Sequence, residues 1–316
     1  MEKKMTKYPF EEKANEFLAF RKGILSEASY KELDRRLRRI NREMIMLKDK
    51  GEISTLSPAK MTADDIKAYF LYRKSRKVSA SDIEHDFGTL DQLLSFNDNA
   101  AVRTCEQRNP GLKPKRDRTQ RLDPLPEETY RRILAMSKEI DYGDFSQVRA
   151  YAMVLIYICT GARNKELRFC KVSDVNTADW IIHFQHVKGE DTYGMPRNVP
   201  IPEPIRPIVS EYLFHRAVFL TAHGATSDAL FFKLGGDFGH LSSNSIRGIK
   251  DRVAKAVGTT FELRDCRRMF GQHYKDNHME MEKISRLMGH KSTRTTELYY
   301  CRVSEREAID DARDRW

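Results

Sequence analysis

A break in hydrophobic periodicity divides this chain into two folding units. Between Glu106 and Pro126 the sequence EQRNPGLKPKRDRTQRLDPLP has four prolines and many charges but almost no apolar residues. This composition is typical of a linker. The 316 residues of the chain are also about twice the ~150 residues of a typical single domain. We therefore predict two domains, at residues 1–110 and 124–316, joined by a basic linker at residues 111–123.

The first domain has the pattern of an all-helical bundle. A capping-box pattern at Ser29–Glu32 and a glycine at Gly51 delimit one helix. Its apolar residues recur at spacings of four and three, which places them on one face. Further helices are expected after Thr62 and from Ser81. The apolar face of the first helix consists of Leu33, Leu37, Ile40, Met44 and Leu47.

The second domain combines helices with a small amount of strand. We expect helices at residues 127–136 and across the apolar run at 150–159. Residues 180–188 and 197–201 have strand character on either side of a turn, which predicts a β-hairpin. Helical periodicity resumes after Glu203. The predicted fold class is therefore mainly α with a small β-hairpin sheet.

Charge and composition narrow the class of protein. The chain carries 56 Lys and Arg against 46 Asp and Glu, a net charge of +10, which favours a polyanionic partner. Residues 1–123 hold 27 of these bases and 20 of these acids, so most of the excess lies in the first domain and linker. The longest apolar run is ten residues, about half of a membrane-spanning helix. The N-terminus has no signal-peptide pattern, and the five cysteines include no CxxC pair. We expect a cytoplasmic protein that does not bind a membrane and contains no metal or cofactor.

Four short segments of the second domain hold chemically active side chains. Taken singly, each has an ordinary explanation: a surface arginine, a solvated lysine, a basic helix face, a helix cap or a core tyrosine. Two arginines three residues apart lie on one helix face, and their planar guanidiniums suit phosphate oxygens. In chain order the residues of interest are Arg163, Lys188, Arg264, Arg267, His290 and Tyr299.

Together these residues resemble the signature of the tyrosine recombinases, the phage-integrase family. The resemblance covers about residues 124–303. The segment TGARNKEL around Arg163 matches the family's Gly-x-Arg-x-x-Glu-Leu box. The intervals from Arg267 to His290 and from His290 to Tyr299 match those of the family. The helical first domain is similar to the family's SAM-like core-binding domain, and the whole resembles the two-domain, Xer-like members.

The resemblance implies a reaction and a set of roles. Members of the family cut and rejoin DNA through a 3′-phosphotyrosyl intermediate, without metal, ATP or another cofactor. Tyr299 would be the nucleophile, and Arg163 and Arg267 would clamp the phosphate. Lys188, on the hairpin, would protonate the departing 5′ oxygen. His290 would form a hydrogen bond to the phosphate.

One position departs from the family pattern. Three residues before the second arginine the family usually has His, and this chain has Arg264. A guanidinium stays protonated and is a poor general base, so Arg264 would either favour the tyrosinate or contact the DNA backbone. In an alternative register Arg264 is the second clamp, but its interval to His290 is three residues too long. Spacing likewise selects Tyr299 over Tyr300.

Glu166 is expected to steady the arginine region rather than to act chemically. Basic residues of the first domain and linker are expected to contact DNA phosphates. For the helical arginines among them, the alternative is an ordinary solvated face. These candidates are Arg35, Arg38, Arg39, Arg42, Lys113, Lys115, Arg116 and Arg118.

The leading hypothesis is a site-specific recombinase acting on double-stranded DNA as a homotetramer that holds two sites. The tail after Tyr299, with a capping pattern at Ser304–Glu307, would dock on the neighbouring protomer as in the family, or pack on its own domain. Two alternatives stay open. One is a catalytically impaired DNA-binding or regulatory protein of the same fold, which Arg264 favours. The other is a nicking and rejoining enzyme like type IB topoisomerases.

Overall fold

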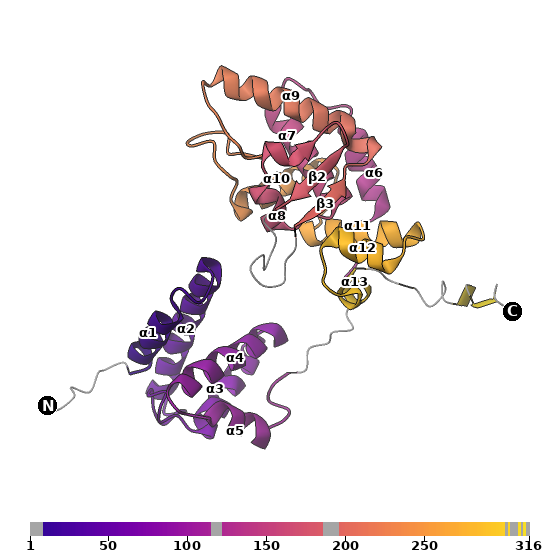
Figure 1. The fold of residues 1–316 in the computed structure, drawn as a ribbon. Coiled ribbons are helices and arrows are strands. Elements are labelled where there is room, and N and C mark those ends of the chain that lie inside the picture. Colours follow the sequence, from indigo (N-terminus) through magenta and orange to yellow (C-terminus); the bar gives the residue numbers. More distant parts are fainter. Residues whose placement is uncertain are drawn as a thin grey trace. The chain divides into compact units, whose positions relative to one another are not determined.

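The chain forms two compact units, residues 1–119 and 120–316 (Figure 1). A computed structural model describes residues 9–114, 122–185, 196–300, 303, 309–310 and 312–313; at residue 299 it describes the backbone alone. The division between the units lies inside the segment expected to be the linker. Each unit has its own cluster of buried apolar side chains, so each is described by itself.

The first unit is helical, as the sequence predicts. Its core includes the apolar face that was expected for the helix between Ser29 and Gly51, which is α2 (Glu27–Asp49) in the structure. Leu37, Ile40, Met44 and Leu47 of that face are all buried. Phe70 and Phe87 stack face to face within the same core, at 3.4 Å between ring centroids. The helices are α1 (Pro9–Arg21), α2 (Glu27–Asp49), α3 (Ala63–Ser75), α4 (Ala80–Phe96) and α5 (Ala101–Arg108).

Two helices begin earlier than the sequence patterns indicate. The side chain of Ser26, not Ser29, caps α2, because Ser26 Oγ accepts the backbone N–H of Ser29. Ser79 caps α4 in the same way. In both cases residues upstream of the expected cap contain no helix breaker, so the helix extends to the earlier serine and gains hydrogen bonds. Thr62 caps α3 as predicted, in a reciprocal pair with Asp65.

The second unit is built around one buried helix, α7. Nearly every residue of α7 from Val148 to Ile158 is buried, and the helix contacts α6, α9, α10 and α11. Figure 1 shows these helices gathered with the small sheet of this unit. The helices are α6 (Glu127–Met136), α7 (Phe145–Thr160), α8 (Asn164–Phe169), α9 (Arg206–Ala222), α10 (Ser243–Ala256), α11 (Leu263–Asp276), α12 (Met281–Met288) and α13 (Thr293–Tyr299), with single 3-10 turns η1 (Val172–Asp174) and η2 (Glu203–Ile205).

The sheet of the second unit has three antiparallel strands in the order β1-β2-β3. They are β1 (Val175–Asn176), β2 (Ile181–Phe184) and β3 (Arg197–Pro200). Strands β2 and β3 form the predicted hairpin, and residue pairs such as Ile182 and Val199 face each other. The sequence did not predict β1, since two residues are too short for a strand pattern. The expected turn at 189–196 lies almost wholly outside the described residues.

Gly161 connects the core helix α7 to the segment that follows it. Its backbone is left-handed, with φ of 58° and ψ of 28°. A β-carbon at this position would lie 2.7 Å from Cδ1 of Phe270 on α11. The position therefore needs glycine for two reasons, backbone conformation and close packing.

We predict that Gly161→Ala lowers the free energy of unfolding of the second unit by about 2–4 kcal/mol, through left-handed strain and overpacking. Urea denaturation followed by tryptophan fluorescence measures this, because both tryptophans, Trp180 and Trp316, belong to the second unit. The matched control is Gly248→Ala on α10, where a β-carbon meets nothing within 4 Å. It is expected to raise stability by about 0.5–1 kcal/mol. Equal effects of the two substitutions would contradict this account of Gly161.

Candidate active site

One buried carboxylate, Glu166 on α8, forms ion pairs with two arginines that come from different segments of the chain. Arg163, immediately before α8, donates from Nη1 to Glu166 Oε1 at 2.6 Å and from its backbone N–H to Oε2 at 2.7 Å. Arg197 at the start of β3 donates from Nη1 to the same Oε1 at 2.8 Å. Glu166 is 1% exposed. The carboxylate therefore fixes the start of α8 relative to β3.

Arg267 on α11 completes a cluster of three guanidiniums. Its Nη1 donates to the carbonyl oxygen of Gly161 at 2.5 Å, and its Nη2 donates to that of Met288. Arg163 Nη2 donates to the carbonyl oxygen of Gly289 at 3.3 Å. Gly161 and Gly289 are the left-handed residues that end α7 and α12. Carbonyls at helix C-termini carry partial negative charge, so these two helix ends stabilise the arginines.

The cluster contains more positively charged groups than negatively charged ones. Burial alone would raise the pKa of Glu166, but the charges of Arg197, Arg163 and Arg267 outweigh it and the pKa is lowered. Glu166 is therefore ionised at neutral pH. Three guanidiniums and one carboxylate leave a net charge of two positive units. An excess of this kind in a partly buried site suits a phosphate group.

Arg267 is the most strongly perturbed of the three arginines. It is 4% exposed, and burial, followed by repulsion from Arg163 and Arg197, lowers its pKa to about 9. It is still protonated at neutral pH. Its Nε is buried and has no hydrogen-bond partner in the described part of the chain. The side chain is therefore a fixed, dehydrated cation, which interacts with an anion more strongly than a solvated one.

His290 lies beside Arg267. Its Nε2 is 2.9 Å from Arg267 Nη2, and its Nδ1 is 2.8 Å from Oγ1 of Thr296 on α13. Burial, followed by the charges of Arg267, Arg163 and Arg197, lowers the pKa of His290 to about 3. The imidazole is therefore neutral at physiological pH.

The structure brings three of the predicted site residues together: Arg163, Arg267 and His290. Glu166, which was expected to steady the arginine region, lies with them and accepts from Arg163 and Arg197. Arg264 is not part of the cluster. It is exposed near the start of α11, and within the described ranges it forms no hydrogen bond or ion pair. The residue of this pair that enters the cluster is thus Arg267, in line with the register chosen from spacing.

Two predicted site residues lie wholly or partly outside the described residues. Lys188 lies outside the described residues. Tyr299 is the last residue of α13, three positions after Thr296, and its backbone alone is described. Helix α13 contacts α12, the helix that precedes His290. The chain therefore carries Tyr299 on the helix whose Thr296 contacts His290.

Arg197 and Thr296 were not expected in the site from the sequence, and Tyr300 was weighed only as the alternative to Tyr299. Arg197 is 7% exposed and alternates with exposed neighbours along β3, on the same face as the buried Val199. A charged residue on the core face of a strand is a usable signal for a buried ion pair. Thr296 is fully buried. The ring of Tyr300 lies 5.4 Å from Arg267 Cζ and 5.0 Å from the His290 ring.

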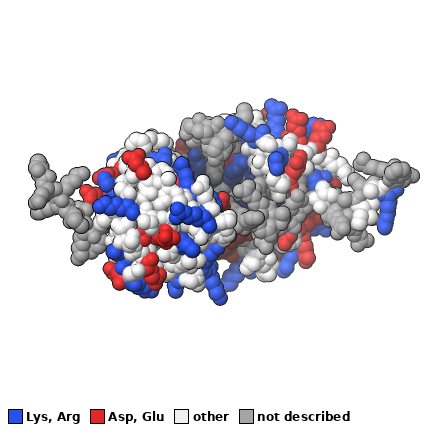
Figure 2. Space-filling model, turned by 90° about the horizontal axis from the view of Figure 1, so that it is seen from below, with Lys and Arg blue, Asp and Glu red and all other residues white. Residues whose placement is uncertain are grey.

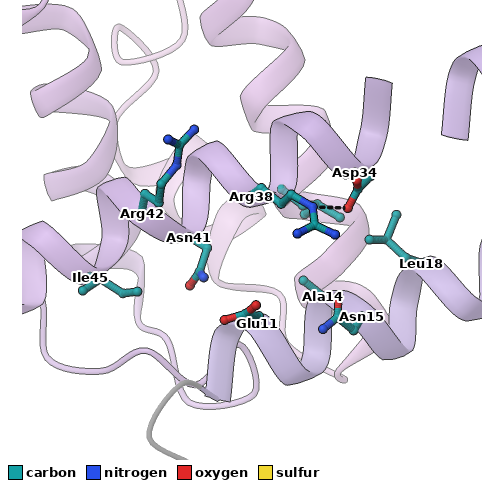
Figure 3. A pocket seen from close by; sticks show the side chains of 10 residues that line it. Glu11, Ala14, Asn15, Leu18, Asp34, Arg38, Asn41, Arg42 and Ile45 are labelled. Carbon is teal, nitrogen blue, oxygen red and sulfur yellow. Dashed lines mark hydrogen bonds and ion pairs between the residues drawn. The ribbon is translucent and has the colours of Figure 1, made fainter. Parts of the chain in front are cut away.

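The arginines of α2 that were expected to contact DNA differ in their surroundings. Arg35 pairs with Glu32 at 2.6 Å and Arg38 with Asp34 at 2.8 Å. Figure 3 shows the second pair beside the groove between α1 and α2, with Arg42 directed away from Asn41. Arg42 is exposed.

Arg39 belongs to an internal network. It donates to Asp86 at 2.5 Å and to Glu43 at 3.0 Å, and Arg73 bonds the same two carboxylates. Asp86 is fully buried. This network ties α2 to α3 and α4, so Arg39 has a structural role within the first unit.

The remaining basic candidates lie near the linker. Lys113 pairs with Glu106 at 2.7 Å, whereas Lys115, Arg116 and Arg118 lie outside the described residues. On the face shown in Figure 2, lysine and arginine side chains are interspersed with acidic ones. The basic side chains on this face therefore do not form one unbroken positive patch.

Two features are absent from the described ranges. No helix there combines the length and apolar character needed to cross a lipid bilayer. No group of three or more His, Cys, Asp or Glu side chains there has an arrangement that could hold a metal ion.

Comparison with known proteins places this geometry in context. The tyrosine recombinase XerA of Pyrococcus furiosus is 24% identical over 158 residues, which cover 48% of this chain and 50% of that protein. The tyrosine recombinase XerD of Mycobacterium tuberculosis is 26% identical over 154 residues, or 48% of this chain and 47% of that protein. The matches thus span about half the length of each relative.

Solved structures share the fold over nearly the whole chain. XerH site-specific recombinase, bound to its palindromic difH substrate in a post-cleavage complex, has a TM-score of 0.72 at 15% identity and covers 99% of this chain and 98% of that one. The Tn1549 transposon integrase in complex with transposon right end DNA has a TM-score of 0.65 at 15% identity, covering 96% and 99%.

The sequence model of the phage integrase family matches residues 124–306. The match begins where the second domain was expected to begin and contains Arg163, Glu166, Arg267 and His290, together with Tyr299. It covers more than half of the chain. The chain therefore belongs to the phage integrase family.

Proposed function

We propose that this protein is a tyrosine-type site-specific DNA recombinase. It cuts and rejoins double-stranded DNA through a 3′-phosphotyrosyl intermediate on Tyr299, without metal or ATP. The observation that carries the proposal is the cluster of three guanidiniums around one carboxylate, with two units of positive charge in excess, beside the helix that ends in Tyr299. Membership of the phage integrase family supports it.

The charge of the cluster matches the charge that develops in the reaction. A phosphodiester carries one negative charge, and attack by tyrosinate adds a second in the transition state. Guanidiniums already held by Glu166 and by helix-end carbonyls need little reorganisation when this charge appears. Arg163, whose side chain is 26% exposed, is the guanidinium most accessible to an incoming phosphate. Arg267 is more deeply buried and adds to the positive electrostatic potential at the position of the phosphate.

In this proposal Tyr299 is the nucleophile of covalent catalysis. A bond forms between its phenolic oxygen and phosphorus, and the bond to the 5′ oxygen of the DNA breaks. Lys188 protonates the departing oxygen in this scheme. The phosphotyrosyl bond retains the energy of the cleaved phosphodiester, so the reverse step with another 5′ hydroxyl rejoins strands. Arg264, exposed near the start of α11, contacts the DNA backbone.

Double-stranded DNA is the partner in this proposal. The XerH and Tn1549 integrase structures, which share the fold, are DNA complexes. Arg42, exposed on α2, is a candidate for a phosphate contact from the first unit. We further propose a homotetramer on two DNA sites, joined through the C-terminal tail, and a cytoplasmic location with the DNA.

A second candidate function is a DNA-binding or regulatory protein of the same fold without cleavage. The observation that favours it is Arg264, which stands where the family usually has His and cannot act as a base. A sequence-tolerant nicking and rejoining enzyme is the third candidate. Covalent capture of DNA separates the second candidate from the other two, and sequencing of the captured DNA separates those two from each other.

We predict that the wild-type protein forms SDS-stable adducts with sheared genomic DNA of its source organism in the presence of EDTA. The Tyr299→Phe variant is expected to form none, because it lacks the phenolic oxygen that bonds to phosphorus. The matched control, Tyr300→Phe, keeps adduct formation. Sequencing of the captured DNA gives one recurrent site for a recombinase and scattered sites for a sequence-tolerant enzyme. Adducts with Tyr299→Phe, or none with the wild type, would refute the proposal.

A second prediction concerns the two arginines of α11. With the captured site as a nicked duplex, Arg267→Lys is expected to lower the single-turnover cleavage rate by at least ~100-fold, since a fixed donor to the phosphate is lost. Arg264→Lys is expected to lower it by less than about tenfold, because an exposed backbone contact tolerates either cation. The opposite order would mean that Arg264, not Arg267, is the second clamp.

A further inference from the structure

The two contacts of the His290 ring determine where its proton lies. A guanidinium has only donors, so Arg267 Nη2 donates to His290 Nε2 across their 2.9 Å contact. In a neutral imidazole the proton must then be on Nδ1. Nδ1 lies 2.8 Å from Thr296 Oγ1, so Nδ1 donates to the threonine hydroxyl. Each ring nitrogen has a hydrogen-bond partner of the matching kind.

The alternative protonation states do not fit this environment. A doubly protonated ring would direct Nε2–H at the guanidinium of Arg267, and Arg163 and Arg197 add further positive charge nearby. Glu166 is the acidic group that opposes them. The lowering of the His290 pKa to about 3 agrees with this geometry. A neutral ring with its proton on Nε2 would place two donors against each other.

This tautomer is not the one that the proposed reaction needs. If His290 forms a hydrogen bond to a phosphate oxygen, it must donate, and Nε2 then needs a proton. The phosphate oxygen can also accept from Arg267 Nη2, which no longer needs His290 as its acceptor. The ring proton therefore changes place when the phosphate binds, with one proton lost from Nδ1 to water and one taken up from water by Nε2.

Thr296 is suited to both states. A hydroxyl is a donor and an acceptor and rotates to suit its neighbour. It accepts from Nδ1–H in the present state and would donate to the Nδ1 lone pair in the other. Thr296 is fully buried, whereas His290 is half-buried. Thr296 lies on α13 three residues before Tyr299, and its carbonyl accepts the backbone N–H of Tyr300.

We propose that Thr296 is a positioning residue that anchors Nδ1 of His290 in both tautomers, while the partner of Nε2, either Arg267 or a phosphate oxygen, decides which tautomer is present. Its hydroxyl holds the Nδ1-protonated ring before DNA binds and supports the Nε2-protonated ring against the phosphate. The same contact orients His290 relative to the helix that carries Tyr299. The role in the reaction rests on the proposed function; the tautomer of the DNA-free protein does not.

The test compares Thr296→Val, which keeps the shape but loses the hydroxyl, with Thr296→Ser, which keeps the hydroxyl. The first measurement is a long-range ¹H–¹⁵N NMR correlation of histidine-labelled, DNA-free protein, with the His290 signals identified by their loss in His290→Gln. Wild type and Thr296→Ser are expected to show the Nδ1-protonated tautomer. Thr296→Val is expected to keep the tautomer that Arg267 imposes but to lose the hydrogen bond of Nδ1, seen as a shift of the Nδ1 ¹⁵N resonance. An Nε2-protonated wild type, or a Thr296→Val spectrum identical to wild type, would overturn the proposal.

The second measurement is single-turnover cleavage of the captured duplex site. Thr296→Val is expected to lower the rate about 10–100-fold, the equivalent of one lost buried hydrogen bond. The Kd for DNA is expected to stay unchanged, and Thr296→Ser is expected to restore the rate. Equal losses with Val and Ser would overturn the proposal. If wild type cleaves no DNA while the NMR result holds, the recombinase function fails and the tautomer assignment stands.

Discussion

Three positively charged guanidiniums lie together in the second unit, and the rest of the site depends on how their repulsion is offset. One buried carboxylate, Glu166, bonds two of them directly. Carbonyls of Gly161, Met288 and Gly289, at the ends of two helices, accept from Arg163 and Arg267. These partners fix the guanidiniums while cancelling only one of their three positive charges. The result is a rigid site with positive charge in excess, which is the condition for stabilising a phosphoryl transition state.

The arrangement of the fold is what makes this possible. Helix α7 is buried in the core, and its left-handed end at Gly161 packs against Phe270 of α11, one turn from Arg267. The strand β3 supplies Arg197, which donates to the same oxygen of Glu166 as Arg163 does. Packing in the core therefore sets the distances in the site, and a change in core packing at Gly161 would move the acceptor of Arg267 directly.

Much of the fold was predictable because it depends on local patterns. Hydrophobic periodicity predicted α2, α3, α4, α6 and α7, whereas α1 and α5 were not predicted. Strand and turn patterns predicted the β2–β3 hairpin. Spacing favoured Arg267 over Arg264. The contacts of Arg197 were not predictable in this way, since its partner Glu166 lies 31 residues earlier and meets it only through tertiary packing. The same holds for the order of contacts Arg267–His290–Thr296. Two helices start earlier than predicted, because more than one serine near each start can cap the helix. Ser26 and Ser79 cap α2 and α4 in place of the later serines. Arg39 illustrates a further limit, because nothing in its helix pattern reveals the buried Asp86.

The central claim is that Arg163 and Arg267 together form a phosphate site. Crystals of the protein soaked in tungstate, a phosphate-like anion located by its anomalous scattering, test this most directly and need no knowledge of the DNA sequence. We expect tungstate within hydrogen-bond distance of both guanidiniums, and its loss in Arg163→Met with Glu166 still bonded to Arg197. Tungstate bound elsewhere while the cluster is intact, or guanidiniums of Arg163 and Arg267 directed to separate regions of the molecule, would contradict the account.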